Sequence, residues 1–312
     1  TQFPGATLAV GGTTGLAASN AGIPADISLT NAGNVLVAAV SASGAQISIT
    51  DAVPLNLGVV NASGDLLVNS TGGLDLGNSS IGGNLVANSG NGNVTQEGAL
   101  SVAGTTNIVA GSGNVHLNNP ANILTRTVTT SGQLVSLTNA VPLNLGVVAT
   151  GGNLLVSSNG GLNLGTSNVG GNLVVNSGNG NVTQDGALSV DGTTDIVAGT
   201  GSVQLSNPGN VFQGALATSG SNVVVGGDTN AFALDASIDS AVSQLESDAL
   251  STDPGNPPDA LNLSSTVSET RDGELVRVTM NIGVNGPQLR ILNGGVRLPD
   301  DDVSVAAVGI NP

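Results

Sequence analysis

The chain has 312 residues and a net charge of −16, and it contains no cysteine, lysine, tyrosine or tryptophan. Its five arginines provide no basic cluster and there is no aromatic platform for stacking bases, so we expect no nucleic-acid partner. No stretch reaches the roughly 18 consecutive apolar residues of a membrane-spanning helix, so we expect no membrane insertion. The lack of cysteine excludes disulfides and thiolate metal sites.

The first 51 residues correspond to the end of a longer repeat. Residues from Asn31 onward align with residues from Asn119 onward, 88 positions later. The chain thus begins part-way through a repeat, and we expect no cap over its first coil. Because a bare strand edge can pair with another strand, the apolar residues of this segment are candidates for self-association: Phe3, Leu8 and Val10.

Two complete copies of the repeat follow, residues 52–139 and 140–227, and about 56 of their 88 aligned positions are identical. A repeat of this length is typical of a stacked architecture. Short apolar runs recur inside each copy and suggest four coils of about 22 residues. The runs alternate apolar and polar residues between Gly, Asn, Ser and Thr, which predicts short strands joined by tight turns. We therefore predict that residues 1–227 form an all-β parallel β-helix of about ten coils, with three strands per coil.

Several polar residues recur at matching positions of the two copies. The pairs Asn84 and Asn172, Asn119 and Asn207, and Asn122 and Asn210 suggest amide ladders or left-handed turn positions. Ser177–Asn181 is Gly-rich but leads into a strand, so we interpret it as a turn and not as a phosphate-binding loop.

We expect no catalytic residue, metal site or cofactor. The only histidine, His116, is replaced by Gln204 in the next copy and is interpreted as an ordinary strand residue. The acidic set Asp185, Asp191 and Asp195 resembles the carboxylates of polysaccharide-cleaving β-helix enzymes or a calcium site. Its counterparts in the preceding copy are Glu97, Ala103 and Asn107, so only one copy carries the set.

The repeat pattern breaks at Asp228. Apolar residues then follow at helical spacing, which predicts one amphipathic helix over Phe232–Leu250 that caps the β-helix or, alternatively, binds a partner. Its apolar face comprises Leu234, Ile238, Val242 and Leu245. Residues 228–258 are thus a capping helix and linker, and residues 259–312 are predicted to form a small antiparallel β meander with an extended apolar tail. The tail residues that could self-associate are Val303, Val305, Val308 and Ile310.

The coils around Gly82–Val102 and Gly170–Val190, with the turns at Asn119-Pro-Ala-Asn and Asn207-Pro-Gly-Asn, resemble the filamentous haemagglutinin-like exoproteins of Gram-negative bacteria. The closing stretch Ile291–Pro299 is similar to the end of such proteins. This resemblance implies a right-handed β-helix, two-partner secretion, an extracellular or cell-surface location, and a role in adhesion or biofilm. The N-terminal secretion domain of that family is not matched, so we expect a fragment, a processed product or a shorter relative.

These observations favour an extracellular structural rod that is not an enzyme. In the version we favour, copies polymerise head to tail into a surface or biofilm filament, with a C-terminal strand of one copy added to the first coil of the next. Alternatively, the chain is the shaft or ligand-binding segment of an adhesin that grips cell-surface or matrix glycans. A polysaccharide-acting enzyme that uses Asp191 and Asp195 is a third hypothesis.

Overall fold

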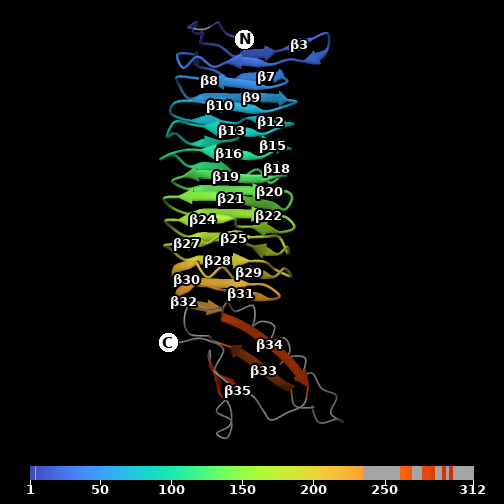
Figure 1. The fold of residues 1–312 in the computed structure, drawn as a ribbon, viewed down its shortest axis with the longest axis vertical. Coiled ribbons are helices and arrows are strands. Elements are labelled where there is room, and N and C mark those ends of the chain that lie inside the picture. Colours follow the sequence, from blue (N-terminus) through green and yellow to red (C-terminus); the bar gives the residue numbers. More distant parts are fainter. Residues whose placement is uncertain (4, 235–260, 269–275, 285–289, 293–294, 298–312) are drawn as a thin grey trace.

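The computed structural model describes residues 1–3, 5–234, 261–268, 276–284, 290–292 and 295–297. The chain winds into an all-β parallel solenoid of about ten turns, stacked from the N-terminal end downward (Figure 1). No described residue lies in a helix, and so none belongs to a helix that could cross a membrane. The predicted fold class is therefore confirmed at the level of a parallel β-solenoid.

Each strand follows directly from the alternation in the sequence. In β10 (Leu66–Asn69), Leu66 and Val68 are fully buried, whereas Leu67 between them is 37 % exposed. Successive side chains of a strand point to opposite faces, so the period of two sends every second residue into the core. The strand stacks in register on its neighbours, with Leu66 opposite Ile47 in the preceding coil and Leu85 in the following one.

Each coil passes through three stacks of parallel strands, which we call faces one, two and three in chain order. Face one contains β5 (Ile27–Leu29), β8 (Ile47–Thr50), β10 (Leu66–Asn69), β13 (Leu85–Asn88), β16 (Thr106–Val109), β19 (Thr127–Gly132), β24 (Thr166–Val169) and β27 (Leu188–Val190). Face two contains β1 (Ala9–Val10), β6 (Val35–Leu36), β11 (Leu74–Asp75), β14 (Val94–Thr95), β17 (Val115–Leu117), β20 (Val135–Asn139), β22 (Leu154–Ser158), β25 (Leu173–Asn176) and β28 (Thr194–Val197). Face three contains β2 (Thr14–Ala17), β7 (Val40–Gly44), β12 (Asn78–Ile81), β15 (Leu100–Val102), β18 (Ile123–Leu124), β23 (Leu162–Asn163), β26 (Val182–Thr183), β29 (Val203–Leu205) and β31 (Val223–Val225). Four longer strands turn a corner between two faces: β9 (Leu55–Ala62), β21 (Leu143–Thr150), β30 (Val211–Ser219) and β32 (Asp228–Leu234).

One coil of the solenoid is shorter than the predicted length of about 22 residues. On face one the register runs from Ile47 through four coils to Val128, a distance of 81 residues. One coil thus takes about 20 residues. The 88-residue repeat therefore contains four coils and seven additional residues, and these seven residues carry the chain onto the next face. Val135, the counterpart of Ile47, accordingly lies on face two and pairs with Leu154. Each copy of the repeat is rotated by one face, about a third of a turn, relative to the copy before it.

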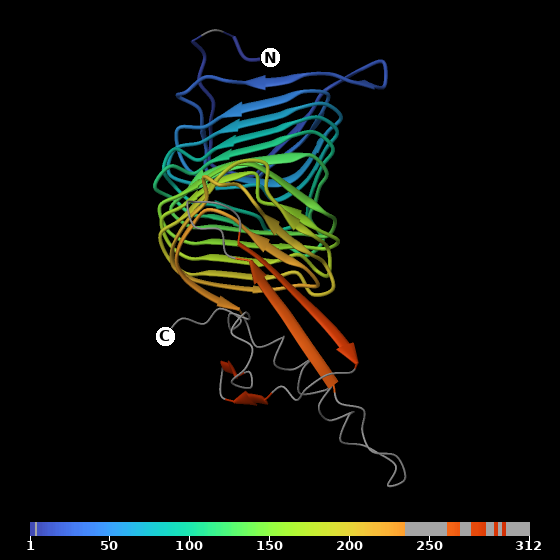
Figure 2. The ribbon, with the colours of Figure 1, turned by 60° about the horizontal axis from the view of Figure 1, so that its bottom comes forward.

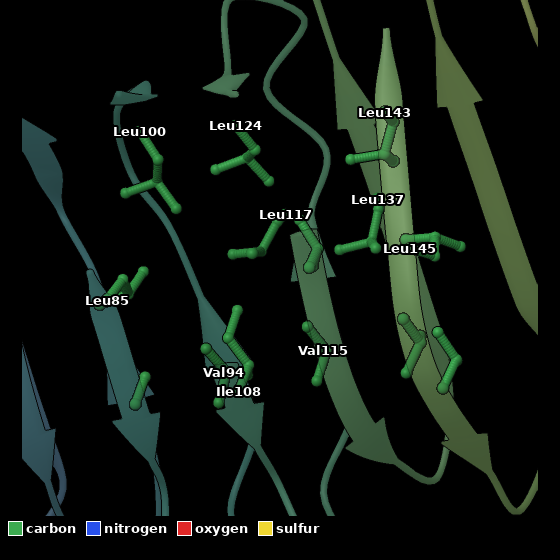
Figure 3. Close-up of a cluster of buried hydrophobic side chains, with 14 of the residues drawn as sticks. Leu85, Val94, Leu100, Ile108, Val115, Leu117, Leu124, Leu137, Leu143 and Leu145 are labelled. Atoms are coloured by element: carbon green, nitrogen blue, oxygen red, sulfur yellow. The ribbon is translucent and has the colours of Figure 1, made fainter. Parts of the chain in front are cut away.

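The core is a continuous column of Leu, Val, Ile and Ala along the solenoid. Figure 3 shows its middle section, where Leu85, Ile108 and Leu117 point from different strands toward the same interior. All three are fully buried, and the largest buried side chain of the column is Phe212. Apart from Phe212, the core residues whose burial the structure describes are all aliphatic, as the composition suggests.

Glycine occupies corners where successive coils approach most closely. A Cβ atom placed on Gly113 would lie 2.0 Å from the carbonyl oxygen of Gly92 in the preceding coil. The equivalent pair in the next copy, Gly201 and Gly180, has a corresponding distance of 2.1 Å. Backbone therefore stacks on backbone at this corner, which accounts for part of the high glycine content.

The carboxyl end of the solenoid departs from the prediction. Asp228 does not end the coils, because β32 continues them and pairs in parallel with β30 from Val211 to Thr218. The predicted helix over Phe232–Leu250 is thus wrong for Phe232–Leu234, which form strand, and its remainder lies outside the described residues. Tertiary pairing with β30 overrides the local helical spacing here.

Four further strands follow in pairs. β33 (Leu261–Ser268) is antiparallel to β34 (Val276–Val284), and β35 (Arg290–Leu292) is antiparallel to β36 (Gly295–Arg297). Their union into one meander stays a prediction.

Candidate functional site

The amino-terminal end of the solenoid leaves its core partly uncovered. Leu8, Val10 and Leu16 pack against the core but are only half-buried. Their counterparts one repeat later, Leu100, Val102 and Ile108, are at most 1 % exposed because a preceding coil covers them. Among the described strands, β1 pairs only with β6 and β2 only with β7, so each keeps one free edge. We call the three half-buried residues and these two strand edges the open core end.

The structure divides the predicted self-association residues into two groups. Leu8 and Val10 belong to the open core end, and Phe3 lies beside it with 83 % of its surface exposed. The tail residues Val303, Val305, Val308 and Ile310 lie outside the described residues. The same holds for Ile238, Val242 and Leu245 of the predicted helix, whereas Leu234 ends β32.

Three buried asparagines bind successive coils together. Asn122 is fully buried, and its Oδ1 accepts hydrogen bonds from the Leu100 amide at 2.9 Å and from Gln96 Nε2 at 2.8 Å. Its Nδ2 donates to Gln96 Oε1 at 2.9 Å and to the carbonyls of Leu117 at 3.2 Å and Thr138 at 3.1 Å. We call this arrangement an amide clasp, because one side chain joins its own coil to the coils on both sides.

The clasp recurs once in every repeat. Asn210 bonds in the same way to Gln184, Leu188, Leu205 and Gly226. Asn34 does so at the amino-terminal end with Gln2, Leu8, Leu29 and Thr50. The three clasps lie on different faces because each repeat is rotated. The amino-terminal clasp holds Leu8 directly before β1, because the Leu8 N–H donates to Asn34 Oδ1 at 3.0 Å, and thereby shapes the open core end.

A second polar position differs between the copies. The amide of Asn139 accepts from the Leu124 N–H at 2.9 Å and donates to the Leu124 carbonyl at 3.1 Å. Asp51, its counterpart, accepts from the Leu36 N–H at 3.2 Å but, when ionised, has no proton to donate. Asp51 is only 1 % exposed, and burial raises the pKa of its carboxyl, opposed by hydrogen bonds from the backbone of Leu36, Val53 and Ala52.

Of the other two recurrent pairs, Asn84 and Asn172 contact the following coil, whereas Asn119 and Asn207 each accept from the N–H two residues later, within their own turn. Asn84 Oδ1 accepts from the Thr105 N–H at 2.9 Å, and Asn172 Oδ1 accepts from the Thr193 N–H at the same distance. The alternative interpretation, left-handed turn positions, applies instead to Asn91 and Asn179, with φ of 73° and 70°. Asn179 lies at the centre of Ser177–Asn181, which is a turn.

The residues considered for chemistry do not converge. His116 is an outward residue of β17, opposite Ser136. Asp185 precedes β27, Asp191 follows it, and Asp195 lies on the next face in β28. In the part of the chain that the structure describes, no group of three or more His, Cys, Asp or Glu residues could hold a metal ion.

Comparison with known proteins yields one family. A model described as repeats of unknown function (DUF5649) matches residues 1–43, 63–131 and 151–219, together more than half of the chain. The second and third matches begin 88 residues apart, in agreement with the repeat. No curated protein and no solved structure matches the chain. The chain belongs to the DUF5649 repeat family.

Proposed function

We propose that this chain is an extracellular structural rod and the subunit of a surface or biofilm filament that assembles head to tail. The open core end is the observation that carries the proposal. At this end the core-facing side chains are those of Leu8, Val10 and Leu16, and each is only half-buried. The strands β1 and β2 each have one edge that no described strand pairs with. Such an edge pairs readily with another strand.

The interior of the rod indicates what kind of partner fits this end. One repeat later, the equivalent surface is covered by a coil in which Ser79 pairs with Leu100, Ile81 with Val102, and Ala87 with Ile108. A coil of the same type is therefore the natural cover. In a filament, a second copy supplies it. In the alternative function, the shaft of a haemagglutinin-like adhesin, further coils of a longer chain supply it.

The carboxyl-terminal partner of this contact stays a proposal. The apolar segment Val303–Ile310 suits addition of a strand to the free edge of β1 or β2. A heterologous contact of this kind does not close on itself, so it generates a filament. Right-handed winding and two-partner secretion also remain predictions based on the resemblance to haemagglutinin-like exoproteins.

Negative-stain electron microscopy of the purified chain over a series of concentrations tests the proposal. We expect fibres whose length grows with concentration and whose formation is lost when residues 303–312 are deleted. The double variant Leu8→Asp with Val10→Asp should also prevent fibres, because it places charges at the open core end. The control is Val86→Asp, which adds a charge at an outward position that is 38 % exposed.

Two results would decide against the filament as proposed. Isolated rods of one length at every concentration would favour the adhesin shaft, and a search for a glycan ligand would follow. Fibres that persist after deletion of residues 303–312 but disappear in the Leu8 and Val10 double variant would retain the open core end and remove the tail from the mechanism.

A further inference from the structure

The first copy of the repeat departs from the other two at one corner of the solenoid. The corner that joins β2 to β5 spans nine residues, Ala18–Asp26, whereas the equivalent corner of the next copy spans five, Ala110–Asn114. The additional residues form a hairpin of β3 (Ser19–Asn20) and β4 (Ile23–Pro24). In a protein built from similar copies of one repeat, a feature found in only one copy is a candidate for a specific role.

The hairpin has a tight turn and carries an apolar side chain. Ala21 and Gly22 form its two-residue turn with φ of 51° and 81°, the combination that suits a tight hairpin. At its base, the Ala18 N–H donates to the Ser43 carbonyl at 3.0 Å, and the Ala45 N–H donates to the Ala25 carbonyl at 2.8 Å. The hairpin projects beyond the outline of the coils (Figure 2), and Ile23 on it is 68 % exposed.

A shallow trough lies on face three beside the hairpin. Its volume is about 290 Å³, its lining is mostly apolar, and its outward residues come from three consecutive coils. These residues are Gly15 and Ala17 of β2, Ser41 and Ser43 of β7, and Val59 and Asn61 of β9. The first of these strands leads directly into the hairpin, so the projection and the depression adjoin each other.

The small residues that open the trough are also specific to the first copy. In the second copy the positions of Gly15 and Ala17 hold Asn107 and Val109, and in the third copy they hold Asp195 and Val197. These larger side chains occupy the space that glycine and alanine leave open. The projection and the depression thus both depend on residues that the other two copies replace.

We propose that two copies of this chain pair side by side through this region, each inserting its hairpin into the trough of the other. An adjoining projection and depression on one surface are what a two-fold symmetric contact requires, because both halves of the contact come from the same patch. Ile23 is the apolar anchor, and the methyl groups of Ala17 and Val59 receive it. The proposal concerns lateral pairing and is independent of head-to-tail assembly.

Sedimentation equilibrium tests the pairing in a full chain that carries Leu8→Asp and Val10→Asp, because these substitutions should prevent fibres and neither residue lines the trough. We expect a monomer–dimer equilibrium that Ile23→Asp weakens by roughly tenfold or more, because the charge would be buried in an apolar trough. The double substitution Gly15→Asn with Ala17→Val, which we call the filled-trough variant, should weaken it similarly. It introduces the residues that the second copy already carries, so the fold accepts them. Replacement of residues 18–26 by the five-residue corner of the second copy gives a third variant. Far-UV circular dichroism verifies that each variant remains folded.

A mixing experiment separates this contact from any other. The Ile23→Asp variant retains its trough, and the filled-trough variant retains its hairpin, so a mixture should form a heterodimer through one remaining contact. Each variant alone should stay monomeric at the same concentration. A chain with only Leu8→Asp and Val10→Asp that stays monomeric, or a dimer that all three further variants leave unchanged, would overturn the proposal. The proposed filament would be unaffected by either result, because its test is fibre growth at the open core end.

Discussion

Replacement of Asn122 by alanine should be among the most damaging single changes in the solenoid. Its side chain is fully buried and takes part in five hydrogen bonds that span three coils. Gln96 is only partly buried and can turn to water when its partner is lost. The Leu100 amide and the Leu117 carbonyl cannot, because their residues are fully buried.

Those two backbone groups determine how much unfolding free energy the variant loses. A buried polar group left without a partner costs about 1–3 kcal/mol, so the variant should lose roughly 2–6 kcal/mol of unfolding free energy. The matched control is Asn118→Ala, four residues earlier on the surface. The Asn118 side chain accepts one hydrogen bond from Ser136 Oγ at 2.7 Å, and surface changes of this kind stay within about 0.5 kcal/mol.

Urea denaturation followed by far-UV circular dichroism measures the difference, since the chain has three Phe and no Trp or Tyr. Because a stacked repeat protein can unfold in parts, hydrogen exchange at the Leu100 amide provides a local measurement. We expect this amide to exchange faster in Asn122→Ala and unchanged in Asn118→Ala. Equal stability of the two variants, together with a Leu100 amide that stays protected, would refute the role assigned to the clasp.

Two further predictions concern positions where the copies can be compared. Asp51→Asn should raise the unfolding free energy at pH 7 by about 0.5–1.5 kcal/mol, because the new amide can donate to the Leu36 carbonyl as Asn139 donates to Leu124. Because the pKa of Asp51 is raised in the folded state, this carboxyl contributes fully to stability below its ordinary pKa of 3.8 and loses that contribution as the pH rises through the folded-state pKa. The gain in unfolding free energy from Asp51→Asn should therefore shrink in acid. Urea midpoints at pH 3 and pH 7 measure both effects, and a gain that is the same at both pH values would contradict the reasoning. Gly113→Ala should destabilise the chain by more than about 1 kcal/mol, because its Cβ would meet the Gly92 carbonyl, whereas Gly12→Ala has open space and should be nearly neutral in the same assay.

The sequence alone predicts the strands and their stacking, because inward and outward residues alternate with a period of two. It does not give the coil length. The apolar runs beginning at Ile108 and at Leu134 look like equivalent strands of successive coils. However, Ile108 lies on face one and Val135 lies on face two. All three faces use the same short apolar alternation, so the pattern counts strands without telling which face each occupies.

The sequence indicates which asparagines have a structural role but not which groups they bind. Two of the three recurrent Asn pairs contact other coils, as the sequence suggests, whereas Asn119 and Asn207 make only local turns. The partners of Asn122 lie 5, 16, 22 and 26 residues away and depend on the stacking register, which the sequence does not show. The hairpin leaves only a weak signal in the sequence, a small insertion near Ile23 and Pro24 relative to the second copy. The error at Phe232–Leu234 has a tertiary cause, since pairing with β30 is invisible to a local helical pattern.

The rotation of each repeat by one face gives the rod a screw symmetry. Each repeat advances by about 21 Å along the axis, from roughly 4.8 Å per strand layer, and turns by a third of a circle. The outward pair Leu67 and Val86 on face one is followed by Leu155 and Val174 on face two. Equivalent patches therefore wind around the rod and do not line up along one side. A longer rod of this design would show the same surface to a partner arriving from any direction, and no single side would carry the continuous apolar stripe along which neighbouring rods aggregate.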